Sequence, residues 1–282
     1  MNRLKPGSGT AFRSLLSYVT LCVFAIFALY PITRIITIAL RPGDQLLSTS
    51  LAFIPAGATL KNFQVLLTET PFLRWLINSS LIALAVTVTG VALASTAGYA
   101  LSRFRFAGRG GMLSGLLVTQ MFPVTMLLLP LYFILIKLSL INSYLGVVII
   151  YTATALPFCI WQLKGYYDTI PVALEESAGI DGCTHWQSFY LVVLPLAAPA
   201  LVITALFSFM TAWNEYVVAA VMLQDVEEFT LPLGLRMFQA NMSTQWGLYA
   251  SGALLVSIPV VITFLFLSRY LVASLSSGAV KG

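Results

Sequence analysis

The chain has 282 residues, of which 59% are hydrophobic and only 9% are charged. A water-soluble globular domain contains about a quarter charged residues, so this composition excludes one and indicates an integral membrane protein. The formal net charge of +5 does not indicate a nucleic-acid partner, because the Lys and Arg residues are scattered along the chain.

Apolar runs long enough to cross a bilayer recur along the chain. A hydrocarbon core of about 30 Å requires about 20 helical residues per crossing. The first run is too long for the core of a signal peptide, and no small-residue cleavage site follows it, so we expect it to remain a span. The sequence predicts an all-α membrane protein with six transmembrane helices, near residues 14–40, 75–101, 112–136, 144–164, 196–223 and 248–274.

The Lys and Arg residues indicate the orientation of these spans. With the N-terminus inside, nine of them lie on the inner side and six on the outer side. Cytoplasmic loops have an excess of such residues, and the tightest cluster, SRFRFAGR at 102–109, lies in a short loop of the kind that sets orientation. We therefore expect three cytoplasmic parts, at 1–13, 165–195 and 275–282, and a transmembrane domain over 14–274.

Small residues and prolines mark special positions within the spans. Gly90, Ala94 and Gly98 recur at intervals of four, which places three small side chains on one helix face and predicts close helix packing. Proline inside a span removes a backbone hydrogen bond and favours a kink. The prolines in question are Pro123, Pro130, Pro157 and Pro259.

Polar side chains within the predicted spans are candidates for a substrate path. In a continuous helix the carboxylate of Glu215 would lie about 12 Å below the outer end of its span, where a charge is costly unless it is paired or faces water. Two interpretations stand side by side: a group in the path or its gate, or a hydrogen-bonded helix contact assisted by Asn214 and Trp213. Asn214 is likewise a candidate for the path. Gln120 could line a polar cavity or bond a neighbouring helix.

A polar stretch at 175–195, EESAGIDGCTHWQSFYLVVLP, interrupts the apolar runs. Pro171 suits the first turn of a helix, with Asp168 or Thr169 as its cap, so VALEESAG should be helical. Asp181 and Gly182 are a turn signal that ends this helix.

A second helix should follow the turn. Thr184 and Gln187 match a capping box that begins a helix running towards Pro195. The stretch is too long and too organised for a simple connector, and a DNA-binding helix-turn-helix would need Arg or Lys in its second helix. Aromatic residues are enriched at the energetic centres of protein interfaces, so three of them predict a docking surface. They are Trp186, Phe189 and Tyr190.

Seven positions of this loop resemble the EAA motif of the membrane subunits of bacterial ABC importers: Glu176, Ser177, Ala178, Asp181, Gly182, Leu194 and Pro195. Ser177 departs from the usual alanine. Further stretches are similar to the smaller of the two maltose-type permease subunits, and they cover nearly the whole chain. These stretches are TLKNF at 59–63, WLINSS at 75–80, YALSRFRFAG at 99–108, WNEY at 213–216 and GAVKG at 278–282.

The resemblance implies a type I importer permease of the bacterial inner membrane, with a five-helix core and one extra N-terminal helix. It implies a second homologous permease subunit, a pair of identical ATPase subunits and an extracytoplasmic sugar-binding protein as partners. In that family the EAA helices dock into a cleft on the ATPase subunits, which implies coupling roles for Glu175, Glu176, Ser177, Ala178, Asp181, Gly182, Trp186 and Phe189. The tail to Gly282 resembles one that reaches into the ATPase dimer, and the loop Gln224 to Trp246 resembles one that probes the binding protein.

The same resemblance implies a transport subunit without cofactor or catalytic site of its own, for maltose, a maltodextrin or a related oligosaccharide. No GxxxxGK[ST] phosphate loop occurs in the sequence, so ATP would be hydrolysed by another chain. Permeases for other sugars or for glycerol phosphate share these motifs. An ion-coupled transporter would show paired intramembrane ion ligands and inverted repeats. A membrane enzyme or a metal site would need clustered ligands, whereas only His185 lies near Cys183.

Overall fold

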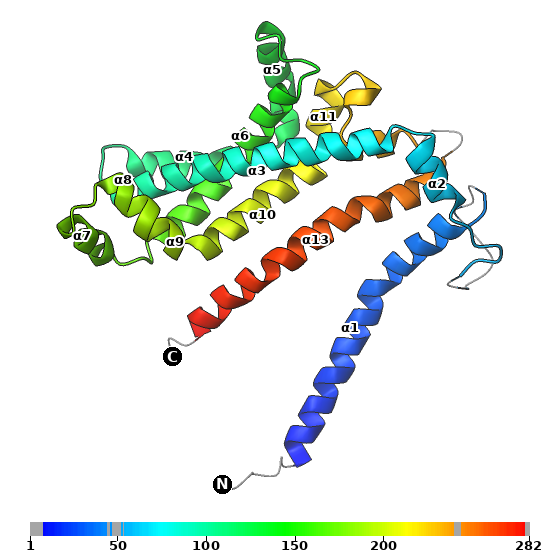
Figure 1. The fold of residues 1–282 in the computed structure, drawn as a ribbon, viewed down its shortest axis with the longest axis horizontal. Coiled ribbons are helices and arrows are strands. Elements are labelled where there is room, and N and C mark those ends of the chain that lie inside the picture. The colour runs from blue at the N-terminus through cyan, green and yellow to red at the C-terminus, as the bar shows by residue number, and fades with distance from the viewer. Residues whose placement is uncertain (1–7, 44–45, 47–51, 53, 240–243, 280–282) are drawn as a thin grey trace. The chain divides into compact units, whose positions relative to one another are not determined.

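The structure, a computed structural model, describes residues 8–43, 46, 52, 54–239 and 244–279, and only the backbone of 8–12 and 269–279. Within these ranges all regular elements are helical (Figure 1). The described residues form two compact units, one from Met1–Thr70 and Phe238–Leu255 and the other from Pro71–Met237 and Val256–Gly282. Three parts of the predicted segments lie outside the described residues: 1–7 of the N-terminal part, 240–243 of the loop 224–246, and 280–282 of the C-terminal tail.

The first unit consists of α1 (Ser8–Leu40), α2 (Lys61–Thr68) and the beginning of α13 (Trp246–Ala279). Asn62 on α2 joins its parts, because its amide Nδ2 donates to the carbonyl oxygens of Ala39 at 2.9 Å and Arg41 at 3.1 Å. Gly247 lies so close to Asn62 that an added Cβ would be 2.5 Å from its Nδ2. Asn62 therefore binds the carbonyls that the end of α1 leaves unpaired.

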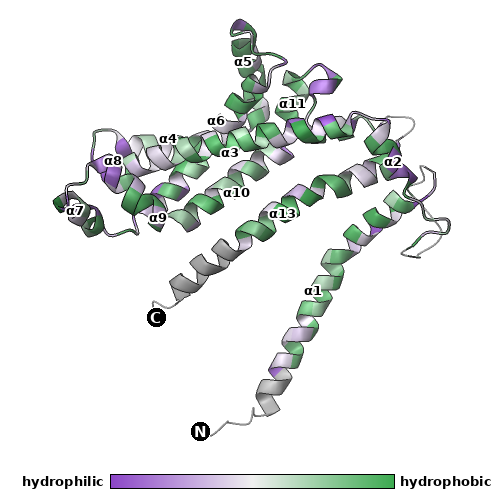
Figure 2. Cartoon of the chain, in the orientation of Figure 1, coloured by the Kyte–Doolittle hydropathy of each residue, from purple (hydrophilic) through white to green (hydrophobic). Residues whose placement is uncertain are grey.

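Helix α1 is apolar on all sides and matches the first predicted span. Figure 2 shows green, hydrophobic residues along its length, and none of its most apolar stretch is buried within the chain. A helix of this kind requires lipid or another protein around it.

The second unit contains the elements that position the functional site. The long helices are α3 (Phe72–Arg103), α6 (Tyr144–Tyr167), α10 (Ala198–Asn214) and the rest of α13. The shorter elements are α4 (Arg109–Thr119), α5 (Val124–Lys137), α7 (Val172–Ile180), α8 (His185–Ser188), η1 (Phe189–Val193), α9 (Leu194–Leu196), α11 (Val217–Met222), η2 (Val226–Glu228) and α12 (Leu231–Arg236).

Helix α3 packs against both α6 and α10, and its small residues make this possible. A Cβ at Gly90 would lie 3.1 Å from the hydroxyl of Ser208 on α10. A Cβ at Gly98 would lie 3.3 Å from the carbonyl oxygen of Ile160 on α6. Ala94 between them is fully buried. The predicted small-residue packing face is confirmed, and it serves two neighbours rather than one.

The six predicted spans correspond to four continuous helices and two bent pairs. The continuous ones are Arg13–Leu40, Phe72–Arg103, Tyr144–Tyr167 and Trp246–Ser268. The predicted span 112–136 is wrong as a single helix, because α4 and α5 meet at 101° and Pro123 is the N-cap of α5. The second bent pair joins His185–Leu196 to Ala198–Asn214 at 80°. The predicted span 196–223 is also wrong as a single helix, because α10 ends at Asn214 and α11 starts only at Val217. Pro130, Pro157 and Pro259 lie inside their helices.

Candidate functional site

The loop between α6 and α10 folds as a helix, a tight turn and a second helix, as predicted. Gly182 has φ +88°, and its N–H donates to the carbonyl of Gly179 at 3.1 Å. The N–H of Cys183 donates to the carbonyl of Ala178 at 2.9 Å. These two bonds around a left-handed glycine form a Schellman motif that ends α7. Pro171 is the N-cap of α7 rather than its first helical residue, which corrects the predicted caps.

The second helix begins at the predicted capping box. The side chain of Thr184 accepts from the N–H of Gln187 at 3.3 Å, and the N–H of Thr184 donates to Oε1 of Gln187 at 2.7 Å. Beyond Ser188 the helix widens, since the N–H of Leu194 bonds the carbonyl of Phe189, five residues earlier. The predicted regular helix to Pro195 is therefore a short α-helix followed by a π-helical turn, a feature often found at functional sites.

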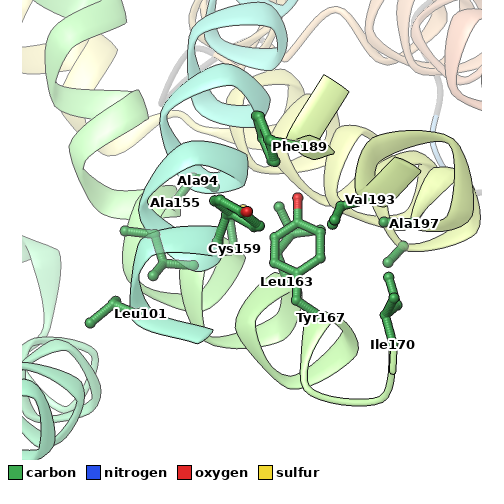
Figure 3. Packing of buried hydrophobic residues seen from close by; sticks show 13 residues of the cluster. Ala94, Leu101, Ala155, Cys159, Leu163, Tyr167, Ile170, Phe189, Val193 and Ala197 are labelled. Atoms are coloured by element: carbon green, nitrogen blue, oxygen red, sulfur yellow. The ribbon is translucent and has the colours of Figure 1, made fainter. Parts of the chain in front are cut away.

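The inner side of this loop is buried against α3 and α6. Phe189 is 1% exposed, and its ring centroid lies 4.6 Å from that of Tyr99. Figure 3 shows Phe189 and Val193 pointing towards Tyr167 and Leu163, with Ala197 beside Val193. The predicted docking role of Phe189 is corrected by this packing, because its ring is taken up by the core.

A buried ion pair fixes the start of α7 to the end of α3. Nε of Arg103 lies 2.5 Å from Oε1 of Glu175, and the side chains are only 9% and 11% exposed. The hydroxyl of Tyr99 donates to Oε2 of Glu175 at 2.6 Å, and Nη2 of Arg103 donates to the carbonyl of Ile170 at 3.0 Å. Glu175 therefore has internal partners, and its predicted coupling role stays a prediction.

A second polar group ties the end of α6 to the same place. Asp168 accepts from the hydroxyl of Ser102 at 2.7 Å and from Nζ of Lys164 at 2.5 Å. Partial burial alone would raise the pKa of the Asp168 carboxyl. The hydrogen bonds from Lys164 and Ser102, together with the charges of Lys164 and Arg109, outweigh it and lower that pKa. Asp168 is therefore held as a carboxylate that bridges α3 and α6.

The outer side of the loop is exposed. Trp186 is 61% exposed and Tyr190 57%, and their rings stack with centroids 6.2 Å apart. The hydroxyl of Ser177, the departure from the motif, donates to the carbonyl of Ala173 at 2.8 Å and leaves the helix undisturbed. Ala178 is half-buried, and the remaining predicted residues of this surface are solvent-exposed: Glu176, Ser177, Asp181 and Gly182.

A groove of about 1030 Å³ separates this loop from the segment after α3. The exposed carboxylate of Glu176, the paired Arg103 and the ring of His185 line it. The stretch YALSRFRFAG indicated topology and a family resemblance, but no contact of Tyr99, Ser102 or Arg103 with the loop was predicted. An acidic residue in the first turn of α7 and an arginine at the end of a span are a charge pair that could have indicated the contact.

Glu215 lies at the break between α10 and α11 in an extended conformation, with φ −71° and ψ 129°. Its carboxylate accepts from the backbone N–H groups of Val217 and Val218, each at 3.0 Å, and Ala219 at 3.3 Å. The depth predicted from a continuous helix does not apply. A carboxylate that accepts from the unpaired N–H groups at the start of a helix is a stabilising cap. These hydrogen bonds favour the interpretation of Glu215 as a hydrogen-bonded helix contact.

The other two intramembrane candidates bond to separate helices. Nδ2 of Asn214 donates to the carbonyl of Met210, one turn back on α10, at 2.8 Å. Gln120 follows α4, and its Nε2 donates to the carbonyl of Thr154 on α6 at 3.1 Å. Both side chains are exposed within the chain. Among the described residues no hydrogen bond joins Gln120 to Asn214 or Glu215, and no group of three His, Cys, Asp or Glu side chains could hold a metal.

Residues 87–277 match the family described as "Binding-protein-dependent transport system inner membrane component". The chain is 35% identical to the diacetylchitobiose uptake system permease protein DasC of Streptomyces coelicolor, over 94% of this chain and 96% of that protein. It is 35% identical to the maltose/maltodextrin transport system permease protein MalG of Salmonella typhimurium, over 96% of both. A bacterial ABC transporter involved in the import of alginate has the same fold, with TM-score 0.80 and 23% identity, over 95% of this chain and 99% of that one.

These similarities confirm the predicted resemblance and the importer permease fold. They also set aside the ion-coupled transporter and the membrane enzyme as alternatives, since the family consists of transport components that work with binding proteins. The chain belongs to the family of inner membrane components of binding-protein-dependent transport systems.

Proposed function

We propose that this chain is a permease subunit of an ATP-driven importer for an oligosaccharide such as maltose or a maltodextrin. Its similarity to the maltose/maltodextrin and diacetylchitobiose permeases supports the sugar class. The main structural support is the helix-turn-helix after α6, which presents the residues of the motif on an exposed face and buries Phe189 on the other.

Docking of a separate ATPase subunit would use the exposed face alone. Glu176 offers a carboxylate to a basic group of the partner, and the stacked rings of Trp186 and Tyr190 offer a rigid apolar contact. Gly182 has no side chain, so a partner could approach the backbone of the turn closely. Glu175 and Phe189 support this surface from behind.

The proposed orientation places the loop at 165–195 in the cytoplasm, together with the termini at 1–13 and 275–282. The transmembrane domain then extends over 14–274. Arg103 ends α3, and Arg105 and Arg109 follow it, at the same end of the bundle as the docking loop. This agrees with the excess of basic residues on the inner side of membrane proteins.

Transport would require a second homologous permease, two identical ATPase subunits and an extracytoplasmic sugar-binding protein. ATP favours the closed ATPase dimer, and a docked loop passes this preference to a helix bundle with an inward-facing and an outward-facing state. Gln120 and Asn214 are exposed within the chain and remain proposed contacts of the sugar path. Glu215 supports this path by capping α11 where α10 breaks.

Charge reversal at Glu176 tests the docking surface. Glu176→Lys should weaken association with the ATPase subunit by about 2 kcal/mol or more, because a like charge would face the partner's basic group. The measurement is co-purification of the ATPase and sugar uptake into proteoliposomes that contain the whole complex. Glu69→Lys, the same change at an exposed position after α2, is the matched control and should behave as the wild type.

A normal yield of ATPase and normal uptake with Glu176→Lys would refute the docking surface. Failure of the wild-type chain to assemble with any ATPase, or sugar uptake by the purified chain alone, would refute the proposed function itself.

A further inference from the structure

Helix α3 is attached by polar side chains at both of its ends. At the inner end, Arg103 holds Glu175 of α7 and Ser102 holds Asp168 at the end of α6. These contacts make the start of the docking loop an extension of α3. The buried ion pair fixes one geometry, because neither charge can leave its partner without a large desolvation cost.

At the outer end, α3 holds the segment that follows α11. Nε1 of Trp75 donates to the carbonyl of Val226 at 2.7 Å. Nδ2 of Asn78 donates to two carbonyls, those of Glu227 at 2.8 Å and Phe229 at 3.0 Å. The segment 226–231 consists of the single turn η2 and two residues that lead into α12, and α3 supplies donors for its carbonyls.

Two further contacts complete this outer attachment. The hydroxyl of Ser79 accepts from the N–H of Leu231 at 2.7 Å. Gly234 on α12 packs directly on the indole of Trp75, where an added Cβ would collide with the ring. Trp75 is 1% exposed and Asn78 is 4% exposed, so the attachment is buried.

Between its two ends α3 is an uninterrupted helix. It contains no proline, and Gly90 and Gly98 let it pack closely on α10 and α6. The 29 residues from Trp75 to Arg103 are separated by 28 helical rises and span about 42 Å, which exceeds the hydrocarbon thickness of a bilayer. Close-packed helices of this kind move as rigid bodies rather than bend.

We propose that α3 transmits motion between the docking loop and the outer segment 226–231, with the Arg103–Glu175 pair as the inner attachment and Asn78 as the outer one. This inference rests on the proposed function, because it assigns the path by which the ATPase and the binding protein influence each other. Arg103, Glu175 and Asn78 are positioning residues, since they act through the segments that they hold.

Charge exchange tests the inner attachment in the purified complex reconstituted with its ATPase and binding protein. Arg103→Glu and Glu175→Arg should each retain the ATPase on co-purification but lower the number of sugars transported per ATP by about tenfold, within the range of allosteric coupling. The double exchange should restore this ratio to within about threefold of the wild type, because the pair is re-formed with reversed sign.

Two results would overturn the inner attachment: single variants with the wild-type ratio, or a double exchange that remains as uncoupled as the single variants. If the single exchanges fail to fold, Glu175→Gln decides the question, since it keeps the shape and the contact with Tyr99 but removes the charge. It should lower the ratio of transport to hydrolysis while the melting temperature stays close to that of the wild type. An unchanged ratio would refute the role of the pair.

Asn78→Leu tests the outer attachment, because it keeps the approximate volume and removes both donors. The complex should assemble and hydrolyse ATP at the wild-type basal rate, while stimulation by the binding protein loaded with maltose or diacetylchitobiose, whichever the wild type imports, falls about tenfold. Ser80→Ala is the control, since Ser80 is exposed and its hydroxyl donates to the carbonyl of Leu76 on its own helix. Stimulation by the binding protein that survives Asn78→Leu would overturn the outer attachment.

Different results would refute the proposed function and the proposed role of α3. A wild-type chain that does not assemble or transport refutes the proposed function. A wild-type complex that works normally, together with variants that keep its coupling ratio and its stimulation, refutes only the role of α3.

Discussion

Two glycines of the docking loop should respond in opposite ways to the same substitution. Gly182 has φ +88°, a region that costs an L-residue about 1–2 kcal/mol. Among the described residues no atom lies within 4 Å of a Cβ built at Gly182, so the cost of Gly182→Ala comes from the backbone. Gly179 lies inside α7 and also has nothing within 4 Å of its Cβ position. Gly179→Ala should therefore stabilise α7 by about 0.5–1 kcal/mol.

Amide hydrogen exchange in the purified protein measures both effects locally. The reporting N–H groups are those of residues 182 and 183, which bond the carbonyls of Gly179 and Ala178 when the turn is formed. These N–H groups exchange when the turn opens, so Gly182→Ala should speed their exchange about 5- to 30-fold. Gly179→Ala should slow it about 2- to 5-fold, because α7 becomes harder to open.

The direction in which each variant shifts the exchange rate tests the prediction. Gly182→Asn is a third variant for the same measurement. Asparagine tolerates the left-handed region better than alanine, so its exchange rate should lie between those of the wild type and Gly182→Ala. If Gly179→Ala and Gly182→Ala shift exchange in the same direction, the assignment of Gly182 as the conformational requirement of the turn is wrong.

Phe189→Ala should destabilise the protein by about 3–5 kcal/mol because it empties a buried site, whereas Trp186→Ala should change stability by less than about 0.5 kcal/mol and weaken ATPase binding; thermal unfolding and co-purification measure the two. Glu215→Gln should retain sugar uptake because its amide oxygen still accepts from α11, whereas Glu215→Leu loses the cap, about 0.5–2 kcal/mol, and should impair uptake; equal uptake by both variants would refute the cap. Asp168 has a lowered carboxyl pKa, so its contribution is complete above about pH 3.8 and is lost as the pH falls through the pKa of the folded state. The difference in melting temperature between wild type and Asp168→Asn should therefore shrink as the pH is lowered towards about 3.

The sequence predicted the local structure of the docking loop well, because that structure depends on near neighbours. The capping box joins Thr184 and Gln187, three residues apart, and the turn needs only the conformational freedom of Gly182. Hydrophobic run length likewise located the spans, since the bilayer sets their length.

The bend between α4 and α5 lies at Pro123, where the sequence predicted a kink. The break between α10 and α11 was not predicted, because hydropathy does not report it. Val217 and its apolar neighbours continue the hydrophobic run past Glu215, so the pattern predicts one continuous helix. The carboxylate of Glu215 nevertheless binds the N–H groups that would otherwise continue the helix, and this competition is visible only in three dimensions.

The sequence by itself determined that this chain is a membrane-spanning helical protein with a motif-bearing loop, because composition, run length and short-range capping signals fix these properties. Tertiary structure alone decided which residues of the loop face outward. Glu175 and Glu176 are adjacent and chemically identical, but only Glu175 meets Arg103, which lies 72 residues away in the sequence. Phe189 is buried and Trp186 is exposed for the same reason, since α3 and α6 pack against only one side of the loop.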